Sequence, residues 1–191
     1  MKGFPERTEA ERLVREAEAC NPGPWGDHSR IAADCAEKIA AAAGMDSEKA
    51  YILGLLHDIG RKFGVKHLCH VWDGYHYMRS LGYAAAARVC LTHSFCLPTL
   101  DVYIGNRDIS PEQQEELENL LRQLSYDDYD RLIQLCDCLA GSEGVMDMEA
   151  RMADVKRRYG FYSQEKWDAN MALKRYFEEK TGKDIYQIVR E

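Results

Sequence analysis

A histidine and an aspartate stand side by side at the end of an apolar stretch. His57 and Asp58 follow the run Ala-Tyr-Ile-Leu-Gly-Leu-Leu and precede Ile59-Gly60. An imidazole and a carboxylate in such surroundings are costly to bury unless a hydrogen-bond partner or a metal ion satisfies both. The pair is therefore the first place to look for chemistry.

Similar side chains recur along the chain at His28, His70, His93 and Asp137. Any one of them alone has an ordinary structural explanation, but packed helices can direct such a set into one interior site. Imidazoles with two carboxylates suit the divalent transition metals Zn, Mn, Fe, Co and Ni better than calcium. Water on such an ion loses a proton near neutral pH and can attack phosphorus or carbon. We predict Asp58 as the catalytic residue, since it could bind the ion and accept a proton from that water.

Helices are expected to position these residues, because apolar side chains recur with helical spacing and no segment alternates like a strand. The expected fold is an all-α helical bundle. Gly60 is expected to end the helix that precedes it, and Ser110, Pro111 and Gln113 form a strong helix start. The predicted helices cover residues 9–20, 27–43, 47–59, 67–80, 83–93, 110–124, 127–140, 146–159 and 163–181.

Residues 96–109 form the longest stretch without periodicity. Loops of that length in a compact domain are commonly functional. The loop over residues 94–109 could line the pocket, where Arg107 could contact a phosphate.

The composition is that of a globular protein with one domain. The chain has 191 residues, of which 46% are hydrophobic and 30% charged, which suffices for one core. We expect a single domain over 1–191, with a core at about 25–140 and a C-terminal helical extension at 141–191. No membrane span or signal peptide is recognised, so a cytoplasmic protein without membrane contact is expected, with seven reduced cysteines.

The charge is unevenly distributed. Residues 107–150 carry 12 acidic and 3 basic side chains, a net charge of −9, so the rest of this −7 chain has a net charge of +2. An acidic protein is a poor binder of nucleic-acid polymers. Arg61, Lys62 and Lys66 remain free to attract a small anion near the His-Asp pair. The later basic run over residues 156–158 is most simply explained as a solvated helix face.

The order of His28, His57-Asp58 and Asp137 resembles the H…HD…D signature of the HD-domain metal-dependent phosphohydrolases. The resemblance covers roughly residues 25–140. It implies an HD-domain helical bundle, a metal held by these four residues, and hydrolysis of a phosphate ester or anhydride. It also implies that Arg61 or Lys62 could hold a phosphate.

Two further histidines resemble those of the dinuclear members of the family. His70, four residues before Gly74, and His93 at a helix end match the extra ligands of that branch, which implies two ions with Asp58 bridging them. Among these members the chain looks most like the bacterial diadenosine tetraphosphate hydrolases. The implied substrate is a nucleotide or dinucleotide, and the oligomeric state stays open, with a homodimer as one option.

Three alternatives stay open. A few dinuclear relatives are iron oxygenases, and a non-catalytic nucleotide-binding protein could keep the same fold. A structural zinc ion could instead be held by Cys69, His70, Cys90 and His93, although this would leave the other histidines and aspartates unexplained.

Overall fold

The computed structural model describes residues 3–190 and is all-α. Helices make up the regular structure of these residues, and the only β-type pairing among them is one isolated bridge between Ala140 and Val145. The all-α prediction is confirmed. The α-helices are α1 (Arg7–Cys20), α2 (Trp25–Ala42), α3 (Ser47–Leu56), α4 (Cys69–Ser80), α5 (Ala84–Thr92), α6 (Pro111–Gln123), α7 (Asp128–Leu139), α8 (Met148–Tyr159), α9 (Gln164–Thr181) and α10 (Ile185–Arg190), and the two 3₁₀-helices are η1 (Ile59–Phe63) and η2 (Leu100–Val102).

Polar side chains begin several of these helices by accepting hydrogen bonds from free backbone N–H groups. The Ser110 hydroxyl accepts from the N–H of Gln113, whose side chain accepts in return from the N–H of Ser110, so the predicted start of α6 is confirmed. Asp46 caps α3, and Asp127 caps α7. The caps define where α3 and α7 begin, and these two helices carry or precede His57, Asp58 and Asp137.

The prediction that Gly60 ends the third helix is wrong. α3 ends earlier, at Leu56, and Gly60 lies inside the 3₁₀-helix η1. A Cβ atom on Gly60 would lie 1.9 Å from the carbonyl oxygen of His70 and 2.6 Å from the N of Gly74. The glycine is there because η1 and α4 approach each other too closely for any side chain. A last helix, α10, was also absent from the prediction.

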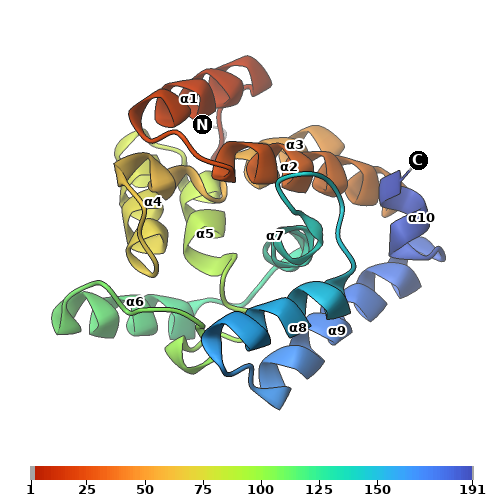
Figure 1. Cartoon of the computed structure of the whole chain (residues 1–191). Coiled ribbons are helices and arrows are strands. Elements are labelled where there is room, and N and C mark those ends of the chain that lie inside the picture. Colours follow the sequence, from red (N-terminus) through yellow and green to blue (C-terminus); the bar gives the residue numbers. More distant parts are fainter. Residues whose placement is uncertain (1–2, 191) are drawn as a thin grey trace.

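Helix α7 is the central element of the bundle (Figure 1), and it packs against α2, α3, α5, α8 and α9. The C-terminal helices pack back onto the earlier ones, since α10 contacts α2 and α9 contacts both α2 and α7. Phe95 and Phe177 are among the largest fully buried side chains. Residues beyond 141 therefore share the core of the preceding bundle.

The long loop after α5 is fastened to the start of α4. The carboxylate of Asp108 accepts hydrogen bonds from the backbone N–H groups of His67 and Cys69 at 2.9 and 2.8 Å. The carbonyl oxygen of Asn106 accepts one from the backbone N–H of Leu68. These bonds hold the loop beside the first turn of α4.

None of the helices in residues 3–190 is both long and apolar enough to cross a membrane. All seven cysteines are free thiols.

Candidate metal centre

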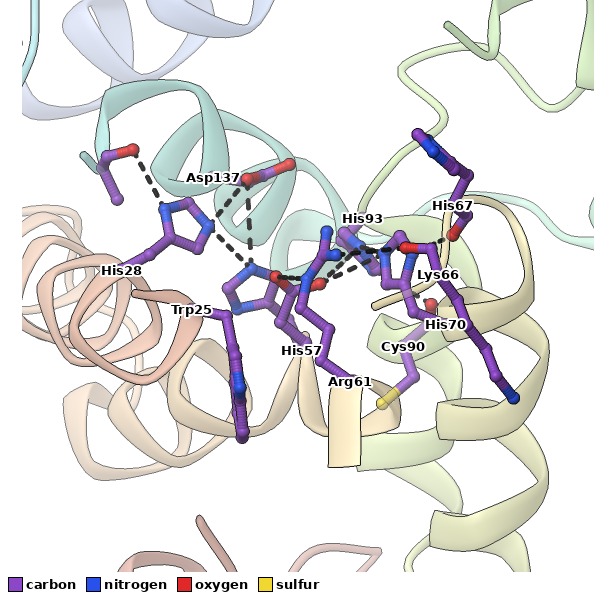
Figure 2. A network of polar contacts seen from close by, with 12 residues as sticks. Trp25, His28, His57, Arg61, Lys66, His67, His70, Cys90, His93 and Asp137 are labelled. Carbon is purple, nitrogen blue, oxygen red and sulfur yellow. Dashed lines mark hydrogen bonds and ion pairs between the residues drawn. The ribbon is translucent and has the colours of Figure 1, made fainter. Parts of the chain in front are cut away.

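The six predicted ligands converge from different helices into two adjacent groups. Figure 2 labels the four histidines among them and Asp137. His28 lies in the first turn of α2, His57 and Asp58 follow the end of α3, and Asp137 lies in the last turn of α7. His70 lies in the first turn of α4, and His93 directly follows α5. The first group is His28, His57 and Asp137, and the second is Asp58, His70 and His93.

In the first group, the Nε2 atom of His28 lies 3.0 Å from Oδ1 of Asp137 and 3.3 Å from Nε2 of His57. The Nε2 atom of His57 lies 3.9 Å from the same carboxylate oxygen. His57 is buried, whereas His28 and Asp137 are partly exposed. This group therefore faces both the core and the solvent.

In the second group, Oδ1 of Asp58 lies 3.1 Å from Nε2 of His70 and 3.5 Å from Nε2 of His93. The two Nε2 atoms are 3.1 Å apart, and all three residues are buried. The rings of His57 and His93 lie 5.0 Å apart between centroids, so the two groups are neighbours.

Backbone carbonyls orient all four imidazoles. The Nδ1 atom of His28 donates to Ala140 at 3.0 Å, that of His57 to Gly54 at 2.6 Å, and that of His93 to Cys90 at 2.9 Å. The Nδ1 atom of His70 donates to the carbonyl of His67. Since a carbonyl only accepts, each Nδ1 carries the proton and each Nε2 offers a lone pair to the interior.

A cation fits these two groups. In each one, two imidazole lone pairs and a carboxylate oxygen face each other, and Oδ1 of Asp58 is buried without a hydrogen-bond partner. Converging acceptors repel one another unless a proton or a metal ion lies among them. Two ligands of one transition-metal ion lie about 3.0–3.4 Å apart, close to the separations of the two imidazole pairs.

The electrostatics of His57, Asp58 and Asp137 favour the protonation states that metal binding requires. Burial lowers the pKa of His57 to about 4, so its imidazole is neutral at pH 7. Burial by itself would raise the pKa of Asp58, but the positive charge of Arg61 holds it well below its ordinary value. The pKa of Asp137 is likewise lowered against the effect of burial, and the neighbouring positive charge of Arg151 contributes to this shift. Both carboxylates are therefore ionised.

A cavity of about 700 Å³ opens onto both groups. Trp25 and the Pro22-Gly23-Pro24 turn form one wall, and the loop after α5 contributes Tyr103 and Ile104. The prediction that this loop lines the pocket is confirmed. A volume of this size is typical of a small-molecule site.

The described lining of this cavity is basic apart from the ligand carboxylates. Four cationic side chains reach it, and the only acidic ones are Asp58 and Asp137. The four are Arg61, Lys66, Arg151 and Arg158. An anion is therefore the kind of molecule that this cavity would attract.

Of the three residues predicted to bind a phosphate, Arg61 is the one that the structure brings to the cavity. Its Nε donates to Oδ2 of Asp58 at 2.5 Å. Lys62 donates instead to the hydroxyl of Tyr77, and Arg107 donates to the carbonyl of Leu100. Neither of these two lines the cavity.

Sequence reasoning did not include Arg151 or Arg158 among the site residues. Arg158 lies in the basic run that we interpreted as a solvated helix face, yet it lines the cavity. The signal that could have found the two arginines is their spacing of seven residues, which places them on one face of a helix.

The four residues of the alternative zinc site do not come together as ligands. Cys90 donates its thiol proton to the carbonyl of Leu56, and the thiol of Cys69 contacts Asp73. His70 and His93 group with Asp58 instead.

Comparison with known proteins agrees with this arrangement. Searches of curated proteins and of solved structures return no match. Residues 25–141, more than half of the chain, match the family described as HD domain, most of whose members are metal-dependent hydrolases. The matched segment contains all six residues of the two groups. The chain belongs to the HD domain family.

Proposed function

We propose that this protein is a metal-dependent phosphohydrolase that holds two divalent transition-metal ions and cleaves a phosphoester or phosphoanhydride of a nucleotide or dinucleotide. The observation that carries the proposal is the pair of adjacent His/His/Asp groups at the base of a basic cavity. His28, His57 and Asp137 would hold one ion, and Asp58, His70 and His93 the other. Fe, Mn, Zn, Co and Ni all suit such ligands.

A divalent ion bound in such a site lowers the pKa of a bound water and polarises a phosphoryl oxygen. The protein's own residues would orient the reactants. Asp58 offers Oδ1 to the second group while its Oδ2 accepts from Arg61, so its carboxylate is fixed from both sides. From that position Asp58 would accept the proton of the attacking water, and the Arg61 guanidinium would hold phosphoryl oxygens.

The first experiment is elemental analysis of the purified protein with single-ligand variants. We expect about two ions per chain in the natural protein and about one in His28→Ala and in His70→Ala, because each removes a ligand of one group. His67→Ala is the matched control, since His67 lines the cavity but belongs to neither group. One ion per chain, unchanged in His70→Ala and His93→Ala, would remove the two-ion proposal.

The second experiment is turnover of a panel of nucleotides and dinucleotides by protein loaded with Mn, Fe or Co. Phosphate or nucleotide release is expected, with a loss of about a hundredfold or more in each ligand variant. A metal-loaded protein that releases nothing from any member of the panel would refute the hydrolase. Oxygen consumption by the iron-loaded protein would point to an oxygenase instead.

A further inference from the structure

Helix α8 contributes to the cavity although it lies beyond the segment that matches the family. The match ends at residue 141, and α8 begins at Met148. Arg151, Arg158 and Tyr159 of this helix nevertheless line the same cavity as the two metal-ligand groups. In Figure 1, α8 lies across α7 from α2, and α7 contacts both of them. This wall of the site is therefore supplied by the C-terminal extension.

Arg151 is tied to the first metal-ligand group. One of its terminal NH₂ groups donates to the carbonyl of Ala140, the same oxygen that accepts from Nδ1 of His28. The other lies 3.6 Å from Oδ1 of Asp137. Arg151 therefore lies at the inner end of this wall, where its guanidinium could contact a phosphoryl group bound beside His28 and Asp137.

Arg158 follows Arg151 by seven residues, or two helical turns. The two side chains therefore leave the same face of α8, with their backbones about 10 Å apart along the helix axis. The side chain of Arg158 is 52% exposed. Among the described residues, the Arg158 side chain makes one hydrogen bond, from Nε to Asp154 at 2.8 Å, so both of its terminal NH₂ groups are free to donate.

The charge of Arg158 is only partly balanced. Asp154 also accepts from Arg157 at 2.6 Å, so one carboxylate serves two guanidinium groups. On the other wall each cation has its own carboxylate, because Arg61 pairs with Asp58 and Lys66 with Asp73. Among the basic residues that line the cavity, Arg158 is thus well suited to bind a further anion.

We propose that α8 forms a second anion-binding site in which Arg158 binds a phosphate, two helical turns along α8 from Arg151 and from the phosphoryl group held beside the candidate metal ligands. This inference rests on the proposed function and narrows its substrate to an elongated molecule with two separated phosphates. An arginine fork binds a phosphate through two parallel hydrogen bonds, which gives both affinity and orientation.

Calorimetric titration of the metal-loaded protein with two matched probes tests the proposal. The probes are hexyl phosphate and 1,6-hexanediol bisphosphate, which differ only in a second phosphate at the far end. We expect the bisphosphate to bind about tenfold more tightly, in line with one charge-assisted contact. Arg158→Gln should abolish this preference, because it should lower the affinity for the bisphosphate about tenfold more than the affinity for hexyl phosphate.

The matched control is Arg157→Gln. Arg157 is the neighbouring residue, shares the same carboxylate and carries the same charge, but it does not line the cavity. This variant should keep the tenfold preference. Two outcomes would overturn the proposal. Either the two variants lose the preference for the bisphosphate equally, or Arg158→Gln weakens the binding of both probes by the same factor. In both cases the general electrostatic field of the cavity would explain the binding.

Phosphorus NMR of the titrated samples and of the nucleotide panel separates this proposal from the proposed function. If no probe or nucleotide is hydrolysed but the preference for the bisphosphate depends on Arg158, the proposed hydrolase function is refuted and the second anion-binding site is supported. If nucleotides are hydrolysed but Arg158→Gln keeps the preference, the second site fails and the hydrolase stands.

Discussion

Single residues decide how the candidate metal centre is oriented. Each of the four imidazoles donates Nδ1–H to a carbonyl within the turn before it or, for His28, to Ala140 at the end of α7. Such bonds fix which ring nitrogen faces the interior. The arrangement is built into the helices themselves, so the lone pairs converge without any further polar residue.

Gly60 is the residue with the least steric freedom beside this centre. In Gly60→Ala the new Cβ would meet the His70 carbonyl oxygen at 1.9 Å. Because the obstacle is backbone, η1 and α4 must separate, and we expect a loss of about 3 kcal/mol or more in unfolding free energy. Chemical denaturation would measure it, and elemental analysis would show a weakened second group.

Gly26→Ala is the control for this substitution. Its Cβ would meet the flexible Glu18 side chain, with Oε1 at 1.9 Å and Cγ at 2.9 Å, and this side chain can turn away whereas backbone cannot. We expect a change of less than about 1 kcal/mol, since alanine also favours the helix. Similar losses in both variants would show that the contact between η1 and α4 is not the cause.

At the scale of helices, α7 holds the end of α5 in place. Asp130 on α7 is fully buried and accepts from the guanidinium of Arg88 and from the hydroxyl of Thr92. Gln134, one turn later, donates to the carbonyls of Thr92 and Phe95. These contacts surround His93, so they position one ligand relative to the helix that carries Asp137.

We expect Asp130→Ala to destabilise the protein by about 3 kcal/mol, because it leaves a buried hydroxyl and a partly buried guanidinium without this acceptor. Metal affinity should fall as well, since His93 loses support. Denaturant unfolding and metal titration are the two measurements. A variant with natural stability and natural metal affinity would contradict this role.

Asp128→Ala, two residues away on α7, is the matched control. Asp128 accepts from Lys180 and Tyr176 of α9, and these hydrogen bonds lower its pKa. The pair is partly exposed, so we expect a cost of at most about 1 kcal/mol at pH 7. A carboxyl whose pKa is lower in the folded than in the unfolded state stabilises the protein at pH values above its unfolded-state pKa of about 3.9. This stabilisation is lost as the pH falls toward and through the pKa of the folded state. The difference between Asp128→Ala and the natural protein should therefore shrink below about pH 4, as thermal unfolding at several pH values would show.

At the scale of the whole molecule, the two groups join segments that are far apart in the sequence. Their members lie in or directly after α2, α3, α4, α5 and α7. Ions bound at both groups would thus link most of the bundle, and a ligand that binds only the folded state stabilises it.

Metal removal should lower the melting temperature. At a free metal concentration about 100 times the dissociation constant, binding adds roughly 2.7 kcal/mol, which corresponds to roughly 5–10 °C for a chain of this size. Thermal melts with and without a chelator would measure this shift. The double variant His28→Ala with His70→Ala should show no such shift, and a chelator effect that persists in it would place the stabilising ion elsewhere.

The sequence alone determined the all-α class, most helix positions and the six candidate ligands, because helical periodicity, caps and the spacing of histidines and aspartates are local properties of the chain. The role of Gly60 could not be predicted from the sequence, because a close contact between η1 and α4 leaves no pattern in the residues around Gly60. Only the tertiary structure decided that the six candidate ligands divide into two groups, that Arg61 rather than Lys62 or Arg107 reaches the cavity, and that α8 adds Arg151 and Arg158 to its wall. These features depend on how helices distant in sequence pack against α7, which no single segment encodes.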